Sequence, residues 1–403
     1  MAEMTEEPII LSSWIEVQEA FRRRELRQAL YDEGAVVMAD CLLSLHGAEH
    51  RDRRRLENRL FRKEVFVHWE REVLGGAIAE TLTPFVAEGS GDLIVLGYRT
   101  TMNLTALIAG IDRQAGTATE TEHLYTIVKK LSEGATLVHS TRDHDEVRDE
   151  VRAALAVFDA EFLQPSIARR AALIDEVTAG ERPETDLPRD VLTTLLCNQD
   201  KLDLAPDVVQ REIAFYLQAG SHSTANAFTH TVDELFRWGA KHPPDLERAR
   251  TDLAFVRACV HETLRHHPAS PVAWRRASEP TVLASGRDIA AGRLVVLDLV
   301  AANRDEQFWG EGAELFDPHR SVPESASPWG HSFGGGLHAC IGQELDGGLE
   351  PRGNDGADDL YGTVAIMVAA FLEAGGRPDP ENPPTLDPNS VRTHFSEYPV
   401  RFS

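Results

Sequence analysis

One cysteine, Cys340, stands in a run made largely of glycine, and this run carries the clearest chemistry in the sequence. The run is Phe333-Gly334-Gly335-Gly336-Leu337-His338-Ala339-Cys340-Ile341-Gly342. Glycine allows positive φ and close backbone approach, so backbone N–H groups in such a turn can point at one sulfur. A thiolate held in this way has a lowered pKa and is a good ligand for a soft metal. We expect Phe333 to shield the sulfur from water and His338 to project sideways toward an anion.

Ordinary explanations compete with a metal site at this run. Three consecutive glycines can form a flexible loop, and a free cysteine is often a small buried apolar residue. A phosphate-binding loop is the weaker alternative, because it needs a Gly-Lys-Ser/Thr ending that this run lacks.

The run resembles the cysteine-ligand loop of cytochromes P450, whose pattern is Phe-x-x-Gly-x-(His/Arg)-x-Cys-x-Gly. Every fixed position of that pattern is present here. The resemblance implies haem b (iron protoporphyrin IX) as the cofactor and Cys340 as the axial ligand of its iron. It also implies cofactor contacts at Phe333, Gly334, His338 and Gly342.

A long helix is predicted over 206–238, with Ala219-Gly220-Ser221-His222-Ser223-Thr224 in its middle. Glycine beside hydroxyl residues is costly inside a helix unless it is used, and it allows a kink or a widened turn. The matching P450 helix crosses the haem face with the pattern Ala-Gly-x-(Asp/Glu)-Thr. The resemblance therefore implies that Ala219 and Gly220 contact the cofactor.

The same helix contains the main departure from the family, because His222 takes the acid position and Ser223 the alcohol position. The acid is implied to relay protons during oxygen activation, and serine can still donate a hydrogen bond. We predict Ser223, His222 and Thr224 as catalytic residues, since histidine can relay protons near neutral pH. Two alternatives for His222 are binding a substrate carboxylate and packing against a neighbouring helix.

Basic residues in two further segments resemble the groups that hold the haem propionates. His50 and Arg54 are four residues apart on a helix predicted over 50–61, so they share a face and can reach one carboxylate. Arg275, in a strand predicted over 272–277, is implied for the second propionate, with Arg276 as the alternative.

A third motif, Glu262-x-x-Arg265, lies on a helix predicted over 255–268. Glutamate and arginine three residues apart can pair on one helix face. The resemblance implies that Arg320 joins them in a buried, structural network, where charges must be paired and hydrogen-bonded.

The remaining pattern is mostly helical, including a helix predicted over 14–31. We expect a mainly α protein with a small β portion: the cytochrome P450 fold with its N-terminal sheet region shortened, in one domain over residues 1–403. The chain ahead of His50 is short for the family. After Gly342 the expected helix is broken at Gly347-Gly348, and the usual Ala-Arg continuation is absent.

Charge is unevenly distributed along this acidic chain. The formal net charge of -24 argues against general nucleic-acid binding. A basic block over 51–63 is either a solvated helix face or a docking patch for an acidic electron carrier. We predict that ferredoxin, with ferredoxin reductase, docks on the patch formed by Arg51, Arg53, Arg55, Arg59, Arg62 and Lys63.

Several sequence patterns indicate where in the cell the protein is found. No run approaches the ~20 apolar residues of a membrane span, and the first residues carry acids rather than the basic start of a secretory signal. The cysteines Cys41, Cys197, Cys259 and Cys340 fit no disulfide framework or zinc spacing. We therefore expect a cytoplasmic enzyme of the soluble bacterial type.

Together these patterns resemble a cytochrome P450, and the resemblance implies a haem-thiolate monooxygenase. It would insert one oxygen atom from O2 into a small-to-medium organic substrate, with electrons from a ferredoxin system. The alternatives are a peroxide-dependent peroxygenase, suggested by His222 in place of the acid, and a non-catalytic haem-binding protein that keeps the fold.

Overall fold

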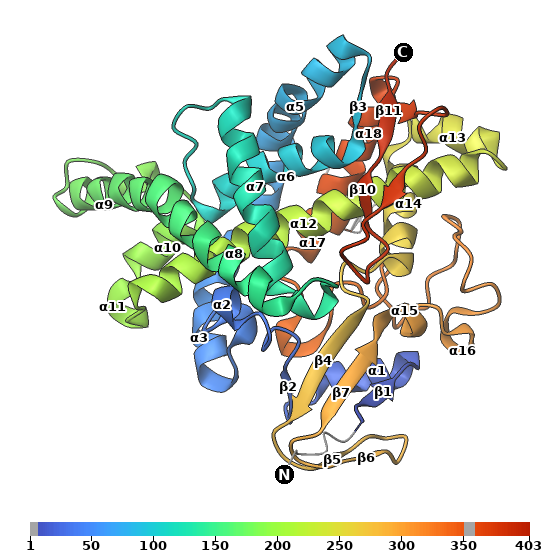
Figure 1. Ribbon diagram of the computed structural model, residues 1–403, viewed down its shortest axis with the longest axis horizontal. Helices are drawn as coiled ribbons and strands as arrows, with labels where there is room; N and C mark the ends of the chain where they lie inside the picture. Colours follow the sequence, from blue (N-terminus) through green and yellow to red (C-terminus); the bar gives the residue numbers. More distant parts are fainter. Residues whose placement is uncertain (1–6, 350–358) are drawn as a thin grey trace.

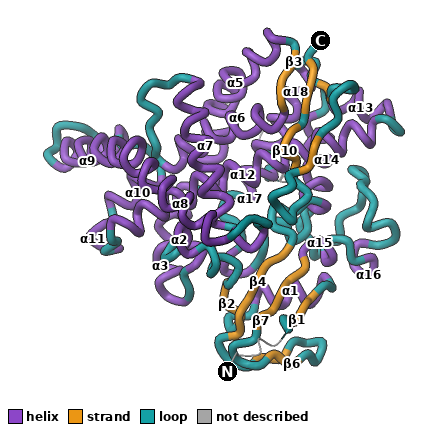
Figure 2. Tube along the Cα trace, viewed as in Figure 1, coloured by secondary structure: helices purple, strands orange, loops and turns teal. Residues whose placement is uncertain are grey.

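The computed structural model describes residues 7–349 and 359–403, which form a large helical body with small sheets (Figures 1 and 2). This confirms the expected mainly α architecture with a small β portion. Its α-helices are α1 Trp14–Arg22, α2 Ala35–Met38, α3 Gly47–Glu57, α4 Lys63–His68, α5 Leu74–Glu88, α6 Leu93–Ala109, α7 Ala118–Ala135, α8 His144–Phe158, α9 Gln164–Thr178, α10 Val191–Cys197, α11 Gln199–Leu202, α12 Pro206–Gly239, α13 Pro243–Ala249, α14 Leu253–His266, α15 Leu299–Ala302, α16 Glu306–Trp309, α17 Gln343–Gly347 and α18 Thr363–Glu373. Its strands are β1 Ile9–Leu11, β2 Leu26–Gln28, β3 Ser90–Asp92, β4 Val272–Ala277, β5 Thr281–Val282, β6 Asp288–Ile289, β7 Leu294–Asp298, β8 Arg377–Pro378, β9 Thr385–Leu386, β10 Phe395–Glu397 and β11 Pro399–Arg401.

A four-stranded sheet in the order β1-β7-β4-β2 lies at one end of the helical body (Figure 1). Strand β1 runs parallel to β7, and the other neighbours are antiparallel. Its two N-terminal strands have three residues each, in keeping with a reduced N-terminal sheet. The register places Arg275 of β4 opposite Gln28 of β2, and successive strand residues alternate between faces. Arg275 is therefore buried, while Arg276 donates from an exposed position to the carbonyl of Gly292.

Helix α12 crosses the middle of the helical body and packs closely on α6 (Figure 1). Proline at its first position suits a helix start, because proline has no N–H to leave unpaired there. A Cβ at Gly220 would lie 2.5 Å from Cγ2 of Thr105, so glycine is required by close approach. The helix is continuous through Gly220, and Ser221 and Ser223 donate to carbonyls four residues earlier. The glycine thus permits helix packing rather than a break.

One predicted helix is shorter in the structure. The segment expected to be helical over 14–31 ends its helix, α1, at Arg22, and Leu26–Gln28 pairs with β4 instead. Pairing with a distant strand overrides local helical spacing, because the sheet provides both hydrogen bonds and burial for Leu26.

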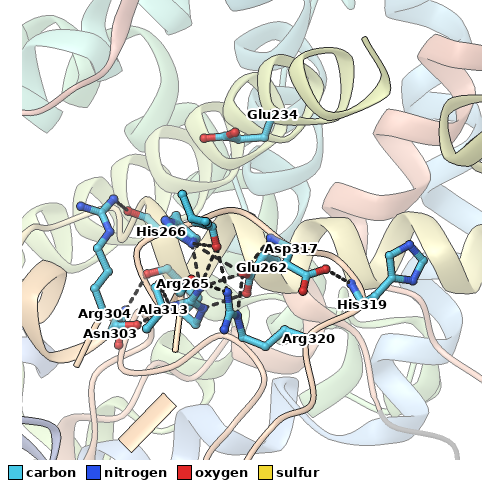
Figure 3. Close-up of polar contacts among 12 residues, drawn as sticks. Glu234, Glu262, Arg265, His266, Asn303, Arg304, Ala313, Asp317, His319 and Arg320 are labelled. Carbon is cyan, nitrogen blue, oxygen red and sulfur yellow. Dashed lines mark hydrogen bonds and ion pairs between the residues drawn. The ribbon is translucent and has the colours of Figure 1, made fainter. Parts of the chain in front are cut away.

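The Glu262 network lies at the end of α14 and is shown in Figure 3. Arg265 donates from Nε and Nη2 to the two carboxylate oxygens of Glu262, each at 2.7 Å, and Arg320 adds a bond of 3.1 Å. Arg265 also donates to the backbone oxygens of Asn303 and Ala313. The network therefore joins α14 to the loops around α15 and α16, as the motif predicts.

No helix within residues 7–349 and 359–403 combines the length and apolarity needed to cross a membrane.

Candidate active site

A cavity of about 310 Å³ brings together residues from α3, α12, β4 and the glycine-rich run. Apolar side chains such as Leu104, Ile108, Phe215 and Leu299 form much of its wall. Every predicted site residue lines it: His50, Arg54, Ala219, Gly220, His222, Ser223, Thr224, Arg275, Phe333, Gly334, His338, Cys340 and Gly342.

The glycine-rich run is shaped by its contact with the end of α1. Gly334 and Gly336 have φ of 69° and 64°, in the left-handed region that favours glycine. A Cβ at Gly336 would overlap the backbone oxygen of Phe21, so only glycine fits there. The backbone N–H of Cys340 donates to the carbonyl of Phe333 at 2.9 Å, which closes the loop. The run is therefore a defined turn that presents Cys340 to the cavity, rather than a flexible loop.

The thiol of Cys340 is accessible because it faces the cavity, although it lies deep in the fold. Burial, followed by the nearby carboxyl of Asp346, raises the pKa of Cys340 to about 11, and the N–H of Gly342 offsets only part of this. The expectation that loop amides alone lower the pKa of this thiol is therefore wrong. A metal cation would remove the proton, because a coordinating thiol is deprotonated outright.

Two histidines meet at one edge of the cavity with spare hydrogen-bonding capacity. The rings of His50 and His338 lie 4.5 Å apart between centroids. Burial lowers the pKa of His50 to about 4 and that of His338 to about 3. Nε2 of His50 and Nδ1 of His338 are buried without a hydrogen-bond partner in the described part of the chain. Each ring can therefore donate to a bound anion.

Two arginines complete this edge. Arg54 donates from Nη2 to the carbonyl of Ala339 at 2.6 Å, next to the cysteine. Arg275 is buried and donates from Nη1 to Oε1 of Gln28, and burial lowers its pKa to about 10. Among residues 7–349 and 359–403, their hydrogen bonds go to carbonyl and amide oxygens, so no carboxylate in this part of the chain neutralises either guanidinium.

These residues fit haem b. An apolar cavity suits a flat apolar macrocycle, and a thiol suits its iron. His50 and His338 have spare ring nitrogens at this edge, and Arg275 is a buried cation without a carboxylate partner among the described residues, so the edge suits two propionates.

The hydroxyl residues of α12 are already engaged. Ser223 donates from Oγ to the carbonyl of Ala219 at 2.6 Å. Thr224 donates from Oγ1 to both carboxyl oxygens of Asp346, at 2.9 and 3.0 Å. Burial raises the pKa of Asp346 to about 7, so this carboxyl can hold or release a proton near neutral pH.

Both ring nitrogens of His222 are hydrogen-bonded. Arg392 donates from Nη1 to Nε2 at 3.0 Å, and Tyr98 lies 2.5 Å from Nδ1. Because an arginine only donates, Nε2 is the acceptor, and Nδ1–H therefore donates to the Tyr98 hydroxyl. Burial, with a smaller contribution from Arg392, lowers the pKa of His222 to about 3. His222 is thus a neutral, fixed imidazole that orients Arg392.

The sequence patterns do not predict several side chains that lie at this cavity. Arg392, His394 and Asp346 line the cavity, and Tyr98 bonds His222 from α6. One feature of the sequence points to Asp346. It follows the cysteine loop in the segment where cytochromes P450 usually have an Ala-Arg pair, which this chain lacks. Arg392 and Tyr98 lie in segments without a recognisable motif.

One residue of the predicted docking patch, Arg53, is buried, so its assignment to the patch is wrong. This residue is 2% exposed, donates from Nη1 to Glu212 at 3.0 Å, and donates from Nη2 to the carbonyl of Asp40. It ties α3 to α12 and is not a surface residue. The other predicted patch residues are exposed: Arg51, Arg55, Arg59, Arg62 and Lys63.

Comparison with known proteins gives a consistent result. The family model described as cytochrome P450 matches residues 212–345, from α12 through the cysteine loop. The chain is 27% identical to the bifunctional cytochrome P450/NADPH–P450 reductase 2 of Bacillus subtilis (strain 168), over 45% of this chain and 19% of that protein. It is also 27% identical to the cyclomarin C epoxidase CymV of Salinispora arenicola (strain CNS-205), over 50% of each chain. The chain thus spans half or less of these relatives' lengths.

Solved structures share the fold across nearly the whole chain. The crystal structure of P450BioI, in complex with acyl carrier protein carrying hexadec-9Z-enoic acid, superposes with a TM-score of 0.74 at 19% identity. That match covers 98% of this chain and 91% of the other. The matched segment, the fold and the geometry of the cysteine loop agree: residues 212–345 match the cytochrome P450 family model, and the chain shares its fold with solved cytochromes P450.

Proposed function

We propose that residues 1–403 form one P450 domain that binds haem b through Cys340 and acts as a monooxygenase on a small-to-medium organic substrate. The observation that carries the proposal is the placement of Cys340 in an apolar cavity beside buried, unneutralised basic groups. Haem b with a thiolate ligand supplies the oxidation chemistry, since the thiolate favours O–O cleavage.

The chain's own residues have separate tasks in this proposal. His50, Arg54, Arg275 and His338 bind the propionates, and Ala219 with Gly220 lets the helix approach the cofactor. Ser223 and Thr224 remain the predicted hydroxyl residues on the cavity wall. Each must release its present acceptor, the carbonyl of Ala219 or the carboxyl of Asp346, before it donates into the cavity. Thr224 and Asp346 together hold a proton there, which places an acid within the site although position 222 carries none.

Electrons come from a ferredoxin and its reductase in this proposal. The exposed basic residues of α3 and the segment after it stand out in a chain of net charge -24. A local positive patch speeds the encounter with an acidic protein. The patch is made of Arg51, Arg55, Arg59, Arg62 and Lys63, without Arg53.

Oxygen incorporation tests the proposal. We expect the purified haem protein, supplied with ferredoxin, reductase, NADPH and heavy-isotope dioxygen, to form product carrying one heavy oxygen atom. The substrate for this assay is the tightest binder in a spectral screen of apolar acids, alcohols and amides. Mass spectrometry of the product measures the incorporation. Product formed only with hydrogen peroxide would contradict the monooxygenase assignment, and no product from either route would indicate a non-catalytic haem protein.

A charge-reversal pair makes the electron route testable in the same assay. Arg51→Glu with Arg59→Glu should slow haem reduction at low salt, and the difference should shrink as salt screens the charges. Arg152→Glu is the matched control, because Arg152 is 60% exposed on α8, outside the patch. Equal slowing in the patch variant and the control would contradict docking at α3.

A peroxide-dependent peroxygenase is the second candidate. One observation favours it: His222 has both nitrogens bonded and a pKa of about 3 under burial, so it does not replace the missing acid as a proton relay.

A further inference from the structure

Arg392 is a buried cation of the cavity that the haem does not require. It lies between β9 and β10, is 8% exposed and lines the cavity. Nη1 donates to His222, whereas Nε and Nη2 have no hydrogen-bond partner among the described residues. Burial lowers its pKa to about 10, which reflects the cost of keeping this charge without an anion.

The unpartnered atoms form one edge of the guanidinium. Nε–H and an N–H of Nη2 point in parallel and match the two oxygens of a carboxylate. The same edge of Arg265 holds the carboxylate of Glu262, and the same edge of Arg169 holds that of Asp112. In Arg392 this edge has no carboxylate.

The surroundings of Arg392 leave its charge uncompensated. His139, His222 and His394 are buried, and burial together with the charge of Arg392 lowers their pKa values, so they are neutral. Tyr31 and Tyr98 are the groups whose charge would favour the guanidinium, and burial raises the pKa of both, so they stay protonated. The nearby polar groups therefore orient the arginine without neutralising it.

The propionates of haem have other partners. Arg54, Arg275, His50 and His338 provide two arginines and two imidazoles for two carboxylates, around the cysteine loop and β4. Arg392 is instead bonded to His222 of α12. Its free edge is available to a second anionic molecule in the same cavity.

We propose that Arg392 binds the carboxylate of the substrate, and that the substrate is an apolar monocarboxylic acid. The inference rests on the proposed function, because it names the substrate class of that site. The Nε–Nη2 edge holds the carboxylate, and the apolar wall takes the hydrocarbon part. His222 is a positioning residue, since its Nε2 accepts from Nη1 while its Nδ1–H is fixed by Tyr98.

Matched ligands test this inference on the haem-loaded full chain. The probes are decanoate and phenylbutanoate, each compared with its methyl ester, which keeps the apolar body and removes the charge. Dissociation constants come from isothermal titration calorimetry, with the Soret shift as a second readout. We expect each acid to bind about 10- to 100-fold more tightly than its ester, the range for hydrogen bonds to a charged group.

Substitutions test whether Arg392 is the residue that causes the preference for the acid over its ester. Arg392→Gln should remove the preference for the acid and leave ester affinity nearly unchanged, while Arg392→Lys should keep part of it. His222→Leu should weaken acid binding with little change for the ester, because Arg392 loses its support. Arg276→Gln is the matched control, since Arg276 bonds Gly292 from an exposed position.

Each outcome decides the inference. Equal binding of acids and esters, no binding of either acid, or an acid preference unchanged in Arg392→Gln would overturn it. If Arg392→Gln instead lowers haem affinity and leaves ligand preference intact, the free edge belongs to a propionate and the inference is wrong. A thiolate-type spectrum of the reduced, carbon monoxide-bound wild type keeps the proposed function intact in all these cases, so the two failures are distinguishable.

Discussion

Acidification is expected to reduce the free energy of unfolding by of order 4 kcal/mol between about pH 6.5 and pH 5.5. Six imidazoles away from the edge formed by His50 and His338, and without a carboxylate partner in the described part of the chain, have lowered pKa values in the folded protein, mainly because of burial: His139, His222, His230, His261, His331 and His394. Each binds a proton in the unfolded chain near its ordinary pKa and remains neutral when folded. The stabilisation of the folded state by these neutral imidazoles is present above the pKa that histidine has in the unfolded chain, and it is lost as pH falls below that pKa.

Three buried carboxyls oppose part of this loss. Burial raises the pKa of Asp346 and of Glu212 to about 7, and burial together with nearby Glu212 raises the pKa of Glu57 well above its ordinary value. Their stabilising contribution is present at low pH and is lost as pH rises. Six groups less three leave about three protons, at about 1.4 kcal/mol per pH unit each. Urea unfolding at several pH values, followed by circular dichroism, measures the slope.

Single histidine variants identify which imidazoles cause the dependence of the unfolding free energy on pH. His331→Phe should keep the stack on Trp14, where the ring centroids lie 3.7 Å apart, and reduce the slope by about one proton. His68→Gln changes an exposed histidine and should leave the slope nearly unchanged. A wild-type stability that is flat over this pH range would contradict the neutral, buried state of these imidazoles.

Arg265→Ala is expected to lower the free energy of unfolding by about 3–5 kcal/mol, because it leaves a buried carboxylate short of its main partner. Burial alone would raise the pKa of Glu262, but the bonds from Arg265 and His266 outweigh it and lower that pKa to about 2. Arg265 is fully buried and also holds the carbonyls of Asn303 and Ala313 (Figure 3). Denaturant unfolding at neutral pH measures the change.

An exposed ion pair provides the control for this substitution. Arg152→Ala removes an arginine that is 60% exposed and paired with Asp149 on α8, so it should cost less than about 1 kcal/mol. Similar losses for the two variants would show that burial does not govern the Arg265 interaction. A second variant, Glu262→Gln, should also destabilise the protein, because it leaves the guanidinium buried beside a neutral amide.

Local motifs explain why much of the site was predictable from the sequence. The spacing of Cys340 from its glycines, and of His50 from Arg54, depends on a few adjacent residues whose chemistry is specific. The central helix was predictable for a similar reason, since its start and its apolar pattern are local. These segments converge on one cavity, although nothing local in the sequence requires it.

Other features depend on which segments meet in space. Arg53 and Arg54 are adjacent, yet a rotation of about 100° around α3 turns one toward Glu212 and the other toward the cavity. Arg392 reaches His222 across 170 positions of sequence, and no motif marks that contact. The raised pKa of Cys340 likewise depends on burial and on Asp346, which a pattern of glycines does not reveal.

The absorbance spectrum of the reduced, carbon monoxide-bound protein tests the central claim most directly. The wild type should show the Soret position of a thiolate-ligated haem, and Cys340→Ala should lose it, while Cys197→Ala, at an exposed cysteine outside the cavity, should retain it. A wild-type band at the position of a nitrogen-ligated haem, or a thiolate-type band that survives Cys340→Ala, would contradict the assignment of Cys340 as the iron ligand.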